Sequence, residues 1–316
     1  MSSFQQINHW KRVSSENQKG VRCDMAYGQH QSFYLRDRWL NKGIKHLATD
    51  ERFFYDKDAF EKIGLGKNMV QSLRYWVVAT GVVSEVYNTE RKKIHRITEL
   101  GDLVFKYDKF IKFPETASIL HYQLVKDIEP SSTWYWYFNV YKETVSTKDS
   151  LLNELIKWVK DTEKKAVSDK SLKRDIDCLV KLYTAGQNVN DPEEVIQSPL
   201  HKLGLVDEIK GVIYKKASNY NHIGLTALMY VLLDYCFQND VDTVSVDDLV
   251  HSIGLWGKTF NISRSSIVNA LNQLTLHPKY PVSYIRTNNL DLIRIPNITP
   301  QNFLQDEYSR KVEVIK

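Results

Sequence analysis

Basic side chains gather in one window of the sequence, between residues 67 and 96. The window holds six basic residues against two acidic ones, Glu85 and Glu90, so its net charge is +4, whereas the whole chain carries only +5. Lysine and arginine side chains neutralise backbone phosphates, so the chemistry indicated is contact with nucleic acid. The six residues are Lys67, Arg74, Arg91, Lys92, Lys93 and Arg96.

Residues 67 to 80 have the periodicity of an amphipathic helix. Met69, Leu73, Trp76 and Thr80 recur on one face, which is expected to pack against the rest of the protein. The other face offers cations, amides and a phenol that can contact DNA. The candidate DNA-binding residues of this helix are Lys67, Asn68, Gln71, Arg74 and Tyr75.

The elements around this helix are those of a winged helix-turn-helix. An apolar helical pattern ends at residues 63–66, and its Gly64 and Gly66 indicate a tight turn before the helix that begins at Lys67. After Gly81, a β-rich run over 82–87 turns at 88–89 and returns over 91–97. In such a unit the helix enters the major groove and the basic wing, with Arg91, Lys92, Lys93 and Arg96, contacts phosphates. The alternative is a packing or protein-docking module with a solvated hairpin.

The last third of the chain repeats this pattern. The run from Asp58 to Lys67 aligns with the run from Asp248 to Lys258, with one inserted residue, Trp256. Helices are expected over 225–237 and 263–276, followed by a hairpin over 282–295. On the last helix Ile267, Leu271 and Leu274 are expected to face inward. The outward residues, which either read bases through amide groups or dock a protein, are Arg264, Ser265, Asn269, Asn272 and Gln273.

The predicted fold is mainly α, of the α+β class, with two winged helix-turn-helix units joined by a helical middle segment. The predicted divisions are a loose leader (1–28), an N-terminal winged-helix domain (29–110), a helical middle domain (111–218), a C-terminal winged-helix domain (219–300) and a tail (301–316). In the middle domain, the aromatic run 134–138 is expected in the core rather than stacked on bases, and His121 is expected to be a core histidine. A loop is expected over 185–191 and a strand over 212–215.

Composition excludes several classes of protein. Hydrophobic residues make up 42% of the 316 residues, which is enough for a large core and excludes a disordered or fibrous chain. The three cysteines, Cys23, Cys178 and Cys236, are far apart, so neither a disulfide framework nor a zinc site is predicted. Neither a signal peptide nor a long apolar run is found, so the sequence predicts a soluble cytoplasmic protein without membrane contact.

Enzymatic motifs are scarce. Gly64 to Lys67 is too short for a phosphate-binding loop and lacks its Ser or Thr. Asp102, Asp108 and Glu115 are possible metal ligands, but capping and surface roles suit them better. No metal site is predicted, and catalytic residues are unknown.

Several segments resemble the SspB-like family of uncharacterised bacterial proteins, which come from operons for DNA phosphorothioation and phage defence. The resemblance spans roughly residues 30 to 300, and Leu65–Val70 with Tyr75–Trp76 is its most specific part. The other matching segments are His30–Arg36, Trp39–Leu40, Lys42–Gly43, Leu120–Tyr122 and Trp134–Asn139.

The resemblance implies a DNA-binding subunit that presents double-stranded DNA to a sulfur-transfer reductase-like enzyme and an ATPase of the same operon. Such a subunit needs no cofactor. The alternatives are a metal-dependent DNA nickase, which would use Mg²⁺ or Mn²⁺, and a protein-docking adaptor or transcriptional regulator. Where the family tends to have an acidic, aromatic stretch, this chain has Asp108–Phe113, with lysines in place of some acids.

Overall fold

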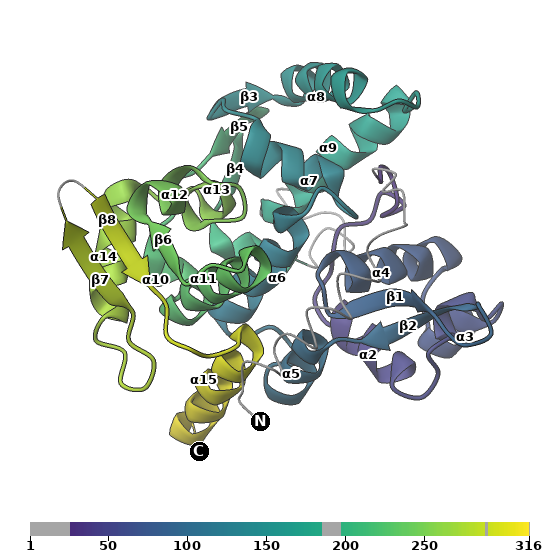
Figure 1. Cartoon of the computed structure of the whole chain (residues 1–316). Coiled ribbons are helices and arrows are strands. Elements are labelled where there is room, and N and C mark those ends of the chain that lie inside the picture. The colour runs from purple at the N-terminus through teal and green to yellow at the C-terminus, as the bar shows by residue number, and fades with distance from the viewer. Residues whose placement is uncertain (1–25, 185–196, 288–289, 316) are drawn as a thin grey trace.

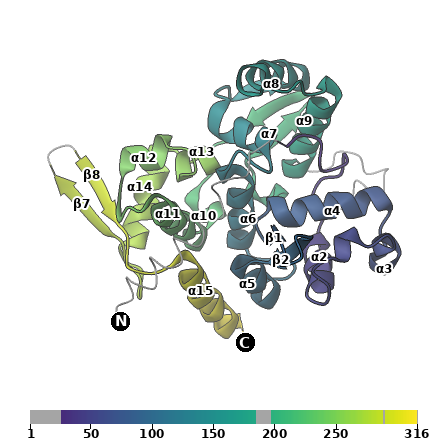
Figure 2. The same cartoon turned by 45° about the vertical axis from the view of Figure 1, so that its right-hand side comes forward.

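The computed structural model describes residues 26–184, 197–287 and 290–315, which form a mainly helical α+β structure with small sheets (Figure 1). Residues 1–25 of the leader predicted over 1–28, and the loop predicted over 185–191, lie outside the described residues. Residues 26–28 are not loose, because the Ala26 and Gly28 N–H groups donate hydrogen bonds to Ser132 and Asp175. Among the helices that are described, none is long and apolar enough to cross a lipid bilayer. The N-terminal and C-terminal units lie at opposite sides of the molecule, with the middle segment and the last helix between them (Figures 1 and 2).

The first unit, residues 29–110, has the predicted order of helix, turn, helix and hairpin. Its α3 ends at Gly64, whose positive φ of 67° suits glycine. Thr98 caps α5 by accepting a hydrogen bond of 3.0 Å from the Gly101 N–H. The elements are α2 (Trp39–Leu47), η1 (Phe53–Tyr55), α3 (Ala59–Ile63), α4 (Lys67–Ala79), β1 (Val83–Tyr87), β2 (Lys93–Ile97) and α5 (Glu99–Tyr107).

The buried face of α4 is close to the predicted one. Leu73, Trp76 and Thr80 are fully buried, as expected. Met69 is only half-buried, and the core is completed by Val70 and Val77 instead. The buried face of α4 therefore includes Val77, which packs against Gly43 of α2.

The middle segment, residues 111–218, packs helices around its aromatic run. Trp134, Trp136, Tyr137 and Phe138 are each at most 2% exposed, which confirms that the run belongs to the core. Its strands form an antiparallel sheet in the order β3-β5-β4. The elements are α6 (Pro114–Lys126), α7 (Ser132–Tyr135), η2 (Trp136–Val140), β3 (Val145–Thr147), α8 (Lys148–Thr162), α9 (Asp169–Tyr183), η3 (His201–Leu203), β4 (Val206–Ile209) and β5 (Val212–Lys215).

The second unit, residues 219–300, repeats the first with an insertion. Gly254 follows α12 with a φ of 77°, as Gly64 follows α3. The short helix α13 is inserted before the long helix, and a Cβ at its Gly257 would lie 2.1 Å from the Val250 carbonyl oxygen, so α13 packs tightly on α12. The elements are α10 (Tyr220–Ile223), α11 (Leu225–Asn239), β6 (Thr243–Ser245), α12 (Val246–His251), α13 (Trp256–Phe260), α14 (Arg264–Leu274), β7 (Ser283–Thr287) and β8 (Leu290–Arg294), with the strands in the order β6-β8-β7.

The prediction of a tail over 301–316 is wrong for residues 301–315, which are helical. Pro300–Ile315 forms the helix α15, which packs against α5 and α11 and so joins the two units (Figure 2). Phe303, Leu304 and Tyr308 are at most 1% exposed. Burial of these large side chains offsets the entropy of ordering the segment.

Candidate nucleic-acid interface

The first turns of α4 present polar side chains to solvent. Lys67, Asn68 and Gln71 are exposed, as predicted. The Lys67 ammonium lies 4.8 Å from the centre of the Phe60 ring, which holds the lysine stem against α3. Residues 67, 71 and 74 share one side of the helix, since they are spaced four and three residues apart. This stripe runs from the helix N-terminus to the β1–β2 hairpin, which Arg74 contacts.

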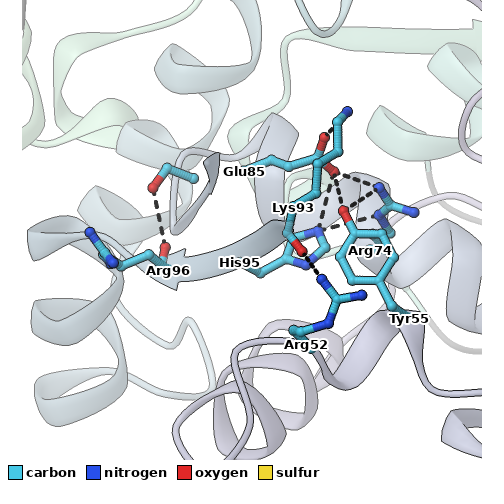
Figure 3. A network of polar contacts seen from close by, with 8 residues as sticks. Arg52, Tyr55, Arg74, Glu85, Lys93, His95 and Arg96 are labelled. Atoms are coloured by element: carbon cyan, nitrogen blue, oxygen red, sulfur yellow. Dashed lines mark hydrogen bonds and ion pairs between the residues drawn. The ribbon is translucent and has the colours of Figure 1, made fainter. Parts of the chain in front are cut away.

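Arg74 does not point freely into solvent. Its guanidinium forms an ion pair with Glu85 on β1 and donates 3.0 Å and 3.2 Å hydrogen bonds to the Tyr55 hydroxyl and to His95 Nε2 (Figure 3). It also stacks on the Tyr55 ring, with Cζ 4.5 Å from the ring centre. Arg74 therefore fixes the angle between α4 and the hairpin.

Glu85 is the centre of this network. It also accepts a hydrogen bond of 2.5 Å from Lys93 and one of 3.1 Å from Tyr55. Although partial burial raises the pKa of Glu85, the hydrogen bonds and charges of Lys93 and Arg74 outweigh that effect and lower it to about 2. Two of the six cations thus share one carboxylate, so Arg74, Lys93 and Glu85 together have a net charge of +1.

Sequence reasoning did not identify Arg52, Tyr55, Glu85 or His95 as members of the site. Arg52 donates a hydrogen bond of 2.6 Å to the Lys93 carbonyl and lies over the Tyr55 ring at 4.9 Å. No spacing rule could have found these residues, because they come from η1 and the residue before it, from β1 and from β2, and they meet through tertiary packing (Figure 3).

Tyr75 lies on the boundary of the buried face. It is half-buried, and its ring packs edge-on against His30 and Trp76, at 6.1 Å and 5.0 Å between ring centres. Trp134, from the middle segment, completes the cluster at 6.3 Å. Burial raises the pKa of the Tyr75 phenol well above its usual value. Tyr75 therefore joins the first unit to the middle segment rather than extending the exposed stripe.

The tip of the β1–β2 hairpin is basic and is held by hydrogen bonds from its own backbone to the Asn88 side chain. The Asn88 side-chain carbonyl accepts hydrogen bonds of 3.0 Å and 2.9 Å from the Glu90 and Lys92 backbones. Arg91 sits in the left-handed region with a φ of 57°, where glycine is preferred. Tyr87, 65% exposed, stands beside this turn. The hairpin thus presents a fixed cationic tip.

The charged groups of Lys92 and Arg96 form ion pairs at the surface. Lys92 lies 2.8 Å from Glu90, and Arg96 lies 3.5 Å from Glu51, with every one of these side chains at least half exposed. Such pairs contribute about 0 to 1 kcal/mol, so a phosphate can replace the carboxylate.

The second unit presents the predicted neutral face. Ile267, Leu271 and Leu274 are at most 1% exposed, which confirms the inward face of α14. Arg264 is exposed and ion-paired with Asp247. The polar residues on the outward face are exposed, and they are Ser265, Asn269, Asn272 and Gln273.

Comparison with known proteins identifies the family. Residues 27–308 match the family described as protein of unknown function DUF4007. The chain belongs to this family. No curated protein sequence matches the chain. The DUF4007 chain is similar in fold to two crystal structures of SspB, one of them described as magnesium ion-bound; each has a TM-score of 0.79 and 20% identity, over 91% of this chain and 88% of that chain. The resemblance to the SspB-like family is thus confirmed.

The carboxylates of this DUF4007 chain that suggested a metal site do not fit one. Asp108 accepts backbone hydrogen bonds of 2.7 Å and 2.9 Å from Lys112 and Phe113, and so caps a turn. Glu115 is paired with Lys311, and Asp102 is exposed on the first turn of α5. Within the described ranges, no group of three or more His, Cys, Asp or Glu side chains is placed to hold a metal ion.

The network predicts acid sensitivity. Burial and the Arg74 charge lower the pKa of His95 to about 4, so the folded protein keeps this imidazole neutral while the unfolded chain titrates near 6.5. The unfolded chain therefore binds more protons than the folded protein between pH 6.5 and pH 4. As the pH is lowered through this range, the free energy of unfolding decreases. Between pH 7 and pH 5, His95 contributes a loss of about 1 to 2 kcal/mol.

Urea unfolding at the two pH values measures this effect. His95→Gln is expected to shrink the loss, whereas His222→Gln, at an exposed histidine, leaves it unchanged. An equal loss in wild type and His95→Gln would show that the folded protein does not exclude a proton from this site.

Proposed function

We propose that this chain is a DNA-binding subunit of a bacterial DNA phosphorothioate-modification and anti-phage system. In this proposal the two units are winged helices, and the first engages duplex DNA. The chain then presents the duplex to a sulfur-transfer reductase-like enzyme and an ATPase. The fold similarity to SspB supports membership of such a system, and the site geometry supports the contact with DNA.

The observation that carries the proposal is the fixed angle between the polar stripe of α4 and the basic hairpin. An α-helix fits the major groove, where its first turns reach base edges. Lys67, Asn68 and Gln71 occupy those turns. The Arg74–Glu85 pair holds the hairpin beside the same helix, so that Arg91 and Lys92 can contact the flanking phosphates.

The second unit has a different role in this proposal. Its neutral amides attract phosphates weakly, since counterion release requires cationic groups. The outward face of α14, with Asn269, Asn272 and Gln273, therefore docks a partner enzyme or contacts DNA without much charge.

Arg91→Gly tests the proposal, because it separates the effect on binding from the effect on folding. Glycine accepts the positive φ of this position, so stability is expected to stay the same or rise by up to about 1 kcal/mol. Duplex binding is expected to weaken, with a log–log salt slope flatter by about 0.9. Fluorescence anisotropy with a labelled duplex measures the slope, and urea unfolding measures stability.

Lys210→Gly is the matched control. Lys210 is also an exposed cation at a positive φ, 51°, but lies in the turn between β4 and β5. It is expected to leave duplex binding unchanged. Equal binding by wild type, Arg91→Gly and Lys210→Gly would reject the hairpin as a DNA contact.

DNA nicking is a second candidate, favoured by the similarity to a magnesium ion-bound SspB. A supercoiled plasmid incubated with the purified protein and Mg²⁺ or Mn²⁺ separates the two functions. The DNA-binding proposal expects the plasmid to stay supercoiled. Relaxation that follows the protein through purification and is lost with a chelator would establish nicking instead.

A further inference from the structure

The segment between α5 and α6, residues 108–113, forms a tight turn that exposes an aromatic ring. The turn is held by Asp108, whose carbonyl accepts a hydrogen bond of 2.9 Å from the Ile111 N–H and whose carboxylate caps the next two residues. Ile111 has a φ of 51°, which is strained for a β-branched residue, and its side chain is buried. This anchoring leaves Phe110 at the surface, 37% exposed.

Two cations lie over the Phe110 ring. The Arg38 guanidinium lies 5.9 Å from the ring centre and the Lys109 ammonium 5.3 Å. Both side chains are exposed. Arg38 also forms an ion pair with Asp37, with 3.7 Å between Arg38 Nε and Asp37 Oδ2. Because both cations are on exposed, flexible side chains, a base can take their place on the ring while they turn to a phosphate.

A hollow of about 370 Å³ lies next to this ring, within the size range of small-ligand sites. Lys202 lies in its wall and donates a hydrogen bond to the carbonyl of the strained Ile111. Strained residues held by their surroundings cluster at binding sites. The lining includes Asp37, Phe110, Ile111, Ser198, Pro199 and Lys202.

We infer that this hollow binds the base of an unpaired nucleotide of a DNA strand, stacked on Phe110, and that Arg38 and Lys109, which lie beside the ring but outside the lining of the hollow, contact its phosphate. Stacking suits any base, because every base has a π-face. The inference rests on the proposed function in that the ligand is DNA, but it adds a site for single strands that is separate from the α4 stripe and the hairpin. A duplex keeps its bases paired and cannot use the Phe110 ring in this way.

Single-strand binding by Phe110→Ala tests the inference. Anisotropy with a labelled 12-nucleotide mixed-sequence strand is expected to show roughly 5- to 100-fold weaker binding than wild type, and Phe110→Trp is expected to restore it. Affinity for a duplex of the same sequence is expected to be unchanged. Because Phe110 is exposed, the variants are expected to fold normally, which a thermal melt checks.

Phe237→Ala is the matched control, since Phe237 has the same 37% exposure but lies on α11. It is expected to bind the single strand as wild type does. The site is refuted if wild type does not bind the strand, if Phe110→Ala binds it normally, or if Phe110→Ala and Phe237→Ala lose it equally. Equal loss of strand and duplex by Phe110→Ala would instead make Phe110 part of the duplex surface. If wild type binds the single strand but not the duplex, the proposed function is rejected and this site is retained.

Discussion

Replacing Arg91, Lys92 and Arg96 together with alanine is expected to flatten the log–log salt dependence of duplex binding by about 2 to 3 units. Each residue is on the β1–β2 hairpin. Unlike Lys93, which pairs with Glu85, Lys92 and Arg96 pair with the exposed carboxylates of Glu90 and Glu51. Each cation that contacts a phosphate releases about one counterion, so its loss removes about 0.9 from the slope. Anisotropy titrations between 50 and 200 mM salt measure the effect.

The control variant removes the same number of charges elsewhere. Lys157, Lys160 and Lys164 are exposed on α8 and just after it. Replacing these three with alanine changes the net charge equally but is expected to shift the slope by much less. Equal shifts in the two triple variants would mean that binding responds only to net charge, and the hairpin would lose its assigned role.

Trp76→Ala is expected to cost about 3 to 5 kcal/mol of stability. The side chain is 0% exposed, and its indole N–H donates a hydrogen bond of 2.9 Å to the Phe33 carbonyl. It also packs edge-on against Trp134 at 5.6 Å, so its loss leaves a cavity between the first unit and the middle segment. Urea unfolding at pH 7 measures the loss.

Trp158→Ala, at a half-buried tryptophan on α8, is the comparison and is expected to lose clearly less stability. A stable Trp76→Ala protein with defective DNA binding would mean that Trp76 contacts DNA. In that case the inward face of α4 would be wrongly assigned.

Local sequence rules predicted the elements of both units well. Apolar spacing located α4 and α14, and Gly64 marked the turn before α4. These features depend on residues within one or two helical turns, which is the range over which periodicity and capping act.

Contacts between distant segments were not predictable in the same way. Periodicity placed Tyr75 on the open face of α4, but Trp134 from the middle segment covers it. Arg74 was expected to be free, yet its partner Glu85 lies eleven residues away on a strand. The spacing of Leu304 and Tyr308, together with Pro300 at the helix start, was a usable signal for α15 that the polar composition of the segment concealed.

Amide hydrogen exchange on the whole protein, with and without a duplex of about 20 base pairs, tests the central claim most directly. If the first unit engages duplex DNA, protection on binding is expected at residues 67–71 of α4 and 88–92 of the hairpin, with little change over α14 (264–274). Protection confined to α14, with the first unit unchanged, would contradict the claim.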